Sequence, residues 1–240
     1  MSVAPRPGAQ RPVLERAIGL QAVVCASAAL CLALASRLVF GDFGALDRIL
    51  LVAVRHAVDH PGADWAALKR VMLLATAAGA FPTLAAVTLI GAALLAMARR
   101  GAAAVRLVLC AGTGVAVANL VKDVFVRGRP EVVPHWVEVS SLSFPSGHSA
   151  DASVVYLLLA GLALDRVGRP PVRRGLGSAA FLLVLLVGLS RVYLGVHWPT
   201  DVLAGWAFGA AWAYVAAPIV TSRREPPDLR RAEPVPRAGG

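Results

Sequence analysis

Charged residues are scarce in this chain of 240 residues: 16% are Asp, Glu, Lys or Arg, against 58% apolar residues and a mean hydropathy of +0.68. The low charge excludes an intrinsically disordered chain, which combines high charge with low hydrophobicity. It also excludes an ordinary water-soluble domain, in which about a quarter of the residues are charged. The remaining class is an integral membrane protein.

Cysteine is also rare. Cys25, Cys31 and Cys110 all lie in apolar stretches, show no C-x-x-C spacing and are odd in number. This pattern indicates neither a disulfide framework nor a zinc site. We interpret the three thiols as small buried hydrophobic side chains.

Six runs without charged residues are candidates for membrane helices. The runs 17–36, 71–98 and 202–222 reach the roughly 20 residues that cross a bilayer. The runs 107–121, 152–164 and 175–190 are shorter, but apolar sequence continues around them. We therefore expect an all-α polytopic membrane protein with six transmembrane helices, in which Pro82 marks a kink or a helix start. The first run exceeds the ~7–15 residues of a signal-peptide core, which favours a retained helix over a cleaved signal.

The distribution of charge predicts the topology. With both tails on one side, that side carries 15 of the 24 basic residues and 5 of the 14 acidic ones. Basic residues mark the cytoplasmic side, so the loops 41–70, 123–147 and 191–200 are expected to face outward. The formal charge of +10 is then a topology signal and not the footprint of a nucleic-acid-binding protein.

The expected organisation has three parts. Residues 1–16 form a cytoplasmic N-terminal tail, residues 17–222 form the membrane domain, and the Pro- and Arg-rich residues 223–240 form a disordered cytoplasmic tail. A composition rich in Ala and Arg with only two lysines suggests a GC-rich bacterial genome. The predicted location is therefore the inner or plasma membrane of a bacterium.

Polar residues gather in three clusters, all at predicted outer ends of helices. Ionisable groups at such places are costly and are usually functional. The clusters are Lys122 to Pro130, Pro145-Ser146-Gly147-His148, and Ser190-Arg191 with His197 and Asp201.

The first cluster suits a phosphoryl group. Lys122 and Arg129 are seven residues apart, about two helical turns, so both side chains can face a shared centre. An ammonium and a planar guanidinium together match several anionic oxygens. The alternative is that both cations only reach toward the membrane interface.

The second cluster is typical of a helix start. Ser146 can cap the helix, and Gly147 lets a ligand approach the backbone, where free N–H groups favour an anion. His148 could donate a proton to a leaving oxygen there. A purely structural cap is the alternative.

The third cluster pairs a histidine with a carboxylate. His197 and Asp201 are four residues apart, so Asp201 can accept from one ring N–H and leave the other nitrogen free to act as nucleophile or base. Arg191 offers a bidentate donor for phosphate oxygens. A structural hydrogen bond is the alternative for the pair, and Pro199 predicts that a helix begins there.

Three further residues have no assigned role. Asp151 lies three residues after His148, and hydrogen bonding to the site and interfacial solvation are both compatible with its position. His135 and Trp136 lie between the first two clusters, where they either contact a head group or belong to a solvated loop.

Together the clusters resemble the three-part signature of the type 2 phosphatidic acid phosphatase (PAP2) family, which is related to bacterial acid phosphatases and vanadium haloperoxidases. The patterns K-x6-R-P, P-S-G-H and S-R-x5-H-x3-D are present in order, with all eleven specified positions filled between residues 122 and 201. The hydropathy pattern is similar to that of the six-helix membrane members, which implies a PAP2-type helical bundle core.

The resemblance implies a role for each matching residue. Lys122, Arg129 and Arg191 would bind the phosphoryl oxygens, together with Ser146 and the backbone N–H of Gly147. His197, oriented by Asp201, would attack phosphorus to form a phosphohistidine, and His148 would protonate the leaving group and later activate water. The family requires no metal ion and no cofactor, because cationic and N–H donors neutralise the transferred group.

These observations predict a metal-independent membrane phosphatase that hydrolyses a lipid phosphate or pyrophosphate at the outer leaflet. Phosphatidate, phosphatidylglycerol phosphate and polyprenyl pyrophosphate all fit as substrates, and the oligomeric state stays open. The alternatives are a phosphotransferase with the same phosphohistidine, a haloperoxidase, which the six spans disfavour, and a non-catalytic transporter or structural membrane protein. A transporter would place its ionisable groups near the middle of the bilayer.

Overall fold

The computed structural model describes residues 42–58 and 65–221. These residues form helices and no strand, so the all-α prediction holds for the described part of the chain. The predicted first span, residues 17–36, and the predicted tails 1–16 and 223–240 lie outside the described residues. The helices are α2 (Asp42–Val58), α3 (Ala66–Ala78), α4 (Phe81–Met97), α5 (Gly101–Phe125), α6 (Gly147–Leu164), α7 (Pro170–Tyr193) and α8 (Pro199–Thr221).

Four of these helices, α5, α6, α7 and α8, are long and apolar enough to cross a membrane. Helices α3 and α4 meet at a bend of 57° and count as a fifth span if the pair crosses as one unit. These helices overlap the five predicted runs between residues 71 and 222. Six spans are therefore not confirmed, because the first predicted run, 17–36, falls outside the described residues.

The bend between α3 and α4 lies where Pro82 predicts a helix start, and that prediction is confirmed. Pro82 occupies the first turn of α4, where its missing N–H costs no helical hydrogen bond. Gly79 lies at the break, and a Cβ there would clash with Val187 Cγ1 and would be 3.3 Å from His148 Cδ2. The absence of a side chain lets the break approach α6 and α7 closely.

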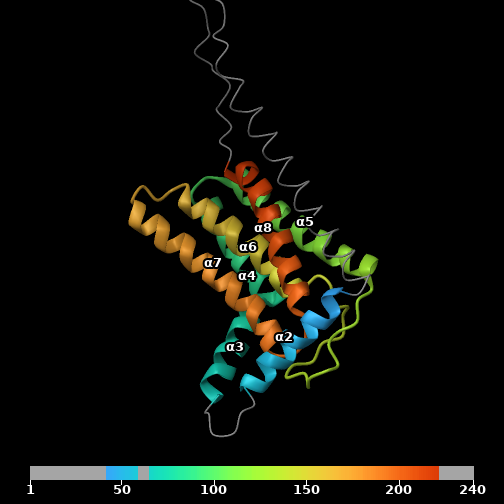
Figure 1. Cartoon of the computed structure of the whole chain (residues 1–240). Helices are drawn as coiled ribbons and strands as arrows, with labels where there is room; N and C mark the ends of the chain where they lie inside the picture. Colours follow the sequence, from blue (N-terminus) through green and yellow to red (C-terminus); the bar gives the residue numbers. More distant parts are fainter. Residues whose placement is uncertain (1–41, 59–64, 222–240) are drawn as a thin grey trace, which may run out of the picture.

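Helix α6 lies at the centre of the bundle, with α4, α5, α7 and α8 around it (Figure 1). Its closest neighbour is α8, which approaches through two glycines one turn apart. A Cβ on Gly205 would be 2.7 Å from the carbonyl oxygen of Ser146, and one on Gly209 would clash with that of Ala150. Small residues at this spacing let two membrane helices pack backbone against backbone.

The outer helices expose apolar side chains, as a lipid environment requires. Leu89 and Leu94 on α4, Leu120 on α5 and Leu182 on α7 are each about 60% or more exposed. In water such surfaces would mark an interaction site or an aggregation hazard. On helices of this length they are the expected contact with hydrocarbon.

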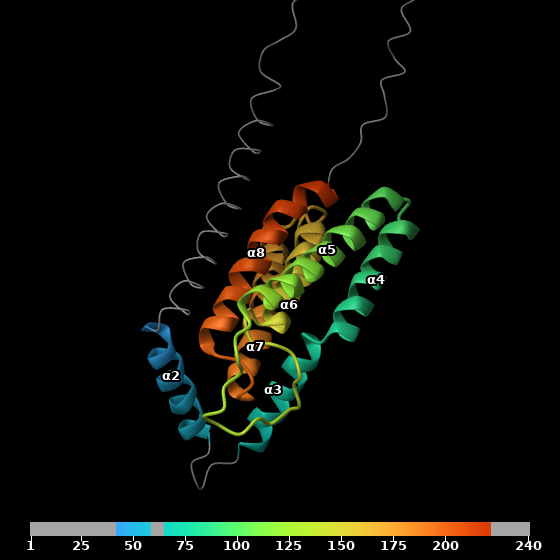
Figure 2. The same cartoon turned by 90° about the vertical axis from the view of Figure 1, so that its right-hand side faces the viewer.

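One end of the bundle carries most of the irregular structure. Figure 2 shows α2, α3 and the loop 126–146 gathered there, away from the turn between α4 and α5. The loop begins where Val126 takes a left-handed conformation with φ of 40° and ends α5. The backbone N–H of Trp136 donates to the carbonyl of Leu194 at 3.1 Å, which connects the loop to the turn between α7 and α8.

Helix α2 differs from the sequence expectation. Residues 41–70 are predicted as an outer loop, but 42–58 are helical and α3 begins at Ala66. With 17 residues, among them acidic and basic ones, α2 is not among the helices that are long and apolar enough to cross a membrane. Its buried face contacts α7 and α8 instead.

Candidate active site

The three polar clusters converge on one cavity of about 300 Å³ at this end of the bundle. The cavity is lined by residues of α5, α6, α7, the loop 126–146, the turn before α8 and the break between α3 and α4. Six of the eight predicted site residues line it: Lys122, Arg129, Gly147, His148, Arg191 and His197. The other two, Ser146 and Asp201, are fully buried behind its wall.

His197 is held by contacts on both ring nitrogens. Its Nδ1 lies 3.4 Å from Asp201 Oδ2, and its Nε2 lies 3.1 Å from Arg129 Nη1. A guanidinium can only donate hydrogen bonds, so Nε2 must present its lone pair and Nδ1 must carry the hydrogen. Both contacts therefore select the same tautomer, in which Nε2 carries no hydrogen.

The surroundings of His197 keep the ring neutral. Burial lowers the pKa of His197 from 6.5 to about 4, although the hydrogen bond and charge of Asp201 act in the opposite direction. The charges of Arg129 and Arg191 lower this pKa further. At neutral pH the imidazole is unprotonated, as nucleophilic attack requires.

Asp201 is anchored by several donors. Its Oδ2 accepts from the backbone N–H of Trp198 at 2.9 Å and from the Ser143 hydroxyl, and its Oδ1 accepts from Arg127 Nη1. Helix α8 begins at Pro199, as predicted, so His197 precedes the helix. The pair meets because the Asp201 side chain folds back over the first turn and caps the Trp198 N–H.

Sequence reasoning missed the next layer of this network. Arg127 also donates from Nη2 to Asp47 Oδ2 at 2.7 Å, which makes a buried ion pair with α2. Asp47 is 1% exposed and accepts from the Thr200 N–H at 3.0 Å and the Thr200 hydroxyl at 2.6 Å. Arg127 occupies an unspecified position of K-x6-R-P, and Asp47 is one acid in an amphipathic segment, so neither has a local signal that reveals its partner.

Arg129 is oriented by the loop and not by a helix. The two-turn helical spacing predicted for Lys122 and Arg129 is wrong, because α5 ends at Phe125. Pro130 disfavours helical geometry at Arg129, which lies in the loop. Its Nε donates to the Ser141 carbonyl at 2.7 Å and its Nη1 to the Val196 carbonyl at 2.6 Å. The two cations still reach the same cavity.

The other two cations enter from helices. A Cβ on Gly147 would be 2.8 Å from Lys122 Nζ, so the glycine makes room for the ammonium at the start of α6. Arg191 is 4% exposed and donates from Nη1 to Thr76 Oγ1 at 2.5 Å, while its Nε has no hydrogen-bond partner in the described part of the chain. A buried donor of this kind is available to a ligand.

Ser146 has a different position from the one expected. It is the residue before α6, but its side chain makes no capping hydrogen bond. Its hydroxyl accepts from Ser149 Oγ at 3.0 Å, and its N–H donates to the Asp201 carbonyl at 2.9 Å. In this structure Ser146 joins two motifs through its backbone and does not bring its hydroxyl to the cavity.

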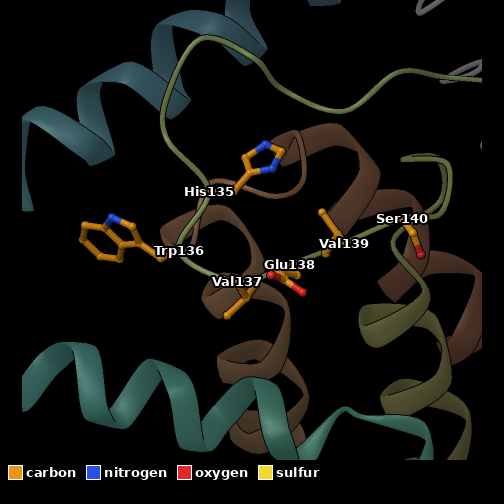
Figure 3. Close-up of a pocket in the computed structure, with 6 residues that line it drawn as sticks. All are labelled: His135, Trp136, Val137, Glu138, Val139 and Ser140. Atoms are coloured by element: carbon orange, nitrogen blue, oxygen red, sulfur yellow. The ribbon is translucent and has the colours of Figure 1, made fainter.

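A wider cavity of about 680 Å³ adjoins the first and is lined by residues 135–140 of the loop. Figure 3 shows this segment running from Trp136 at one end to Ser140 at the other. Val139 and Ser140 line both cavities. The Trp136 ring lies 3.9 Å from Arg55 Cζ and 4.7 Å from Lys69 Nζ, so protein cations already contact it. The smaller cavity has the cations and histidines that reaction chemistry needs.

Metal ligands do not cluster in residues 42–58 and 65–221: no group of three or more His, Cys, Asp or Glu side chains there could hold a metal ion. Metal independence stays a prediction.

Comparison with known proteins gives the family. The model of the PAP2 superfamily matches residues 103–225, which is just over half of the chain. The chain belongs to the PAP2 superfamily. The match includes all three motifs and therefore the cations and histidines that line the cavity, while Gly79 and Phe81 of its lining precede the matched residues.

Two curated PAP2-like relatives are lipid phosphatases by name. Phosphatidylglycerophosphatase B of Bacillus subtilis is 38% identical over 104 residues, which cover 43% of this chain and 51% of the relative. Decaprenylphosphoryl-5-phosphoribose phosphatase of Mycobacterium tuberculosis is 38% identical over 112 residues, 42% of this chain and 55% of the relative. The aligned part thus spans about half the length of these curated relatives.

A solved structure extends the similarity to the fold. The crystal structure of a transmembrane PAP2-type phosphatidylglycerolphosphate phosphatase from Bacillus subtilis matches with a TM-score of 0.73 and 29% identity. The match covers 81% of this chain and 94% of that chain. Together with the long apolar helices, this similarity identifies the chain as a multi-pass membrane protein of the PAP2 superfamily.

Proposed function

We propose that the protein is a membrane phosphatase that hydrolyses a lipid phosphate through a phosphohistidine at His197. The observation that carries this proposal is the state of His197: its Nε2 presents a lone pair to a cavity lined by Lys122, Arg129 and Arg191. A neutral nucleophile among three cations is suited to attack on a phosphoryl group.

Binding comes first. The terminal phosphoryl group of the substrate enters the cavity and takes hydrogen bonds from Arg129, Arg191 and Lys122. Two guanidinium groups and one ammonium offset the charge that spreads over the three equatorial oxygens during transfer. Arg129 then turns its Nη1 donor from His197 Nε2 to a phosphoryl oxygen, which leaves Nε2 free to approach phosphorus.

The first chemical step forms the intermediate. His197 Nε2 attacks phosphorus, the bond from phosphorus to the ester oxygen breaks, and His148 donates a proton to the departing oxygen. The lipid product leaves as an alcohol, or as a lipid phosphate if the substrate is a diphosphate. Asp201 stabilises the positive charge that develops on the ring through the Nδ1–H contact.

The second step restores the enzyme. His148, now unprotonated, removes a proton from a water molecule that attacks phosphorus, and the bond from phosphorus to Nε2 breaks. Inorganic phosphate leaves, and His148 holds the proton that the next cycle needs. Water and lipid phosphate are the only reactants, so this sequence needs no metal ion or cofactor.

Three features support a lipid substrate at the outer leaflet. The cavity lies at one end of membrane helices, where a head group can enter while its chain stays in hydrocarbon. The relatives are named for phosphatidylglycerophosphate and decaprenylphosphoryl-phosphoribose. The basic residues Arg99 and Arg100 occupy the turn at the opposite end of the bundle, and basic turns mark the cytoplasmic side (Figure 2).

The test is phosphate release by the purified protein in detergent with EDTA present. Phosphatidylglycerol phosphate, phosphatidate and polyprenyl diphosphate are compared as substrates. We expect metal-independent release that disappears in His197→Ala and persists in His56→Ala, an exposed histidine on α2. If the substrate is consumed only when an alcohol is added, and its phosphoryl group appears on that alcohol, phosphotransfer replaces hydrolysis. Phosphate release that survives in His197→Ala would refute the phosphohistidine.

A further inference from the structure

Asp151 is a buried acid in the site whose function the reaction above does not explain. It lies on α6, three residues after His148, and is 9% exposed. Residues at this spacing share one face of a helix. Asp151 therefore lies about one turn further into the bilayer than the proposed proton donor, on the same side of α6.

Asp151 also lies at a junction between two cavities. It lines the cation-lined cavity and an apolar cavity of about 250 Å³ between α4, α5 and α6. The apolar cavity is walled by Leu84, Val115 and Val155, and Phe81 is the other residue that the two cavities share. A substrate with its phosphoryl group in one cavity and its chain in the other passes Asp151.

The carboxyl group has unused hydrogen-bonding capacity. Its Oδ1 is inaccessible to solvent and has no hydrogen-bond partner among residues 42–58 and 65–221. Its Oδ2 would lie 3.9 Å from a Cβ on Gly147, on the side where Lys122 approaches. Buried acceptors without a partner are rare because each costs free energy. The position and the missing donor both indicate a ligand group that donates a hydrogen bond.

We propose that Asp151 is a specificity-determining residue that accepts a hydrogen bond from a hydroxyl group of the substrate. The hydroxyl belongs to the carbon next to the ester carbon of the scissile phosphate. This proposal rests on the proposed function, because His148 then sets where the leaving oxygen lies. The preferred substrate class is a lipid phosphomonoester with a hydroxylated head group.

The chemistry of the alternatives explains the selectivity. In phosphatidate the neighbouring oxygen is acylated and donates no hydrogen bond. In a polyprenyl diphosphate the inner phosphate brings only acceptor oxygens and negative charge to the same place. An acceptor that faces another acceptor stays unpaired, which is the arrangement that sites reject most strongly.

The experiment combines two substrates with two enzymes. The substrates are phosphatidylglycerol phosphate and an analogue in which propane-1,3-diol replaces the head-group glycerol, so that only the hydroxyl is lost. The enzymes are the wild type and Asp151→Leu, both assayed in detergent by phosphate release. We expect the wild type to prefer the hydroxylated substrate about ten- to a hundredfold in kcat/KM, and Asp151→Leu to prefer it less than about threefold.

Two further measurements separate this proposal from others. Asp151→Asn keeps the shape but adds N–H donors, so we expect its ratio of diphosphate to hydroxylated-substrate hydrolysis to rise about tenfold. If the wild type does not distinguish the two substrates, or if both variants lose activity equally on all of them, Asp151 only supports Lys122 and the proposal fails. Failure of the proposed function would appear instead as activity in His197→Ala.

Discussion

The two sides of the His197 ring differ in how completely their polar groups are paired. Behind the ring, Asp201 receives donors from Arg127, Ser143 and Trp198. In front of it, Arg191 Nε and Asp151 Oδ1 lack partners within the described residues. We call the Asp201 side of the ring the rear and the cavity side the front. At the rear the polar groups are paired and fix one tautomer of His197, whereas at the front two polar atoms keep hydrogen-bonding capacity for a ligand.

Asp201→Asn should disrupt the contacts behind the His197 ring most strongly. The amide can donate to Nδ1, which would move the ring hydrogen to Nε2 and remove the nucleophilic lone pair. We expect kcat to fall by about 10³–10⁴ with a much smaller change in KM. Steady-state phosphate release measures both constants. An equal fall with unchanged tautomer, read from histidine ¹⁵N shifts, would contradict this explanation.

Arg191→Lys should disrupt the cavity side of the site most strongly. The variant keeps the positive charge but loses the planar fork and the unpaired Nε donor. We expect kcat/KM to fall by about 10²–10³, as for the loss of one donor to a transition-state oxyanion. Arg173→Lys, an exposed residue on the same helix, is the matched control and should retain full activity. Equal losses in both would show a general effect on α7.

The second layer behind Asp201 should have a smaller effect on rate and a larger one on stability. Arg127→Ala leaves Asp47 buried without its ion-pair partner, and a broken buried pair costs about 3–5 kcal/mol. We expect a lower unfolding temperature in detergent and a fall in kcat of about ten- to a hundredfold. The double variant Arg127→Ala with Asp47→Asn should recover part of the stability, because Asp47 then carries no buried charge, while Asp201 has still lost its contact with Arg127. Additive losses would indicate that the two residues act independently.

The pKa of His197 shows whether the pair of His197 and Asp201 is buried or exposed to solvent. The ring is buried in its neutral form with a pKa of about 4, below its ordinary 6.5. The folded state therefore keeps its full stability above about pH 6.5 and loses part of it as the pH falls toward 4. A titration of the His197 ¹⁵N shifts in the free enzyme measures this pKa. A midpoint near the ordinary value would show that the pair is hydrated.

Ser146→Ala tests whether the Ser146 hydroxyl belongs to the cavity side of the site, and it should have the smallest effect on activity. The hydroxyl is buried against Ser149, and the cavity lining does not include it. We expect kcat and KM to change less than about threefold. Ser141→Ala is the informative partner, because Ser141 lines the cavity and its hydroxyl contacts Arg129 at 3.1 Å. A loss of a hundredfold in Ser146→Ala would place this hydroxyl on the substrate after all.

Much of the front of the site could be predicted from the sequence. Its residue types and spacings are specific, so Lys122, Arg129, His148, Arg191 and His197 are recognisable from the three motifs alone. The helix starts at Pro82 and Pro199 follow from the chemistry of proline. The bent α3–α4 pair and α5 to α8 overlap apolar runs, while the first predicted run lies outside the described residues.

The rear could not be predicted, because its contacts join distant segments. Asp47 and Arg127 are eighty residues apart, and nothing in their local sequence distinguishes them from exposed charges. Arg129 shows the same limit at short range. Helical periodicity correctly predicted that Arg129 and Lys122 share a site, but they are not on one helix. Helix α5 ends at Phe125, and the loop that follows brings the two side chains together.

The most direct test of His197 as the nucleophile is to trap the phosphoryl group on the enzyme. The purified protein is mixed with a lipid substrate labelled in its terminal phosphate, quenched with alkali within milliseconds, and analysed by peptide mapping. We expect a label that is stable in alkali, labile in acid, located on His197 and absent from His197→Ala. A label on another residue, or phosphate release by His197→Ala at the wild-type rate, would contradict it.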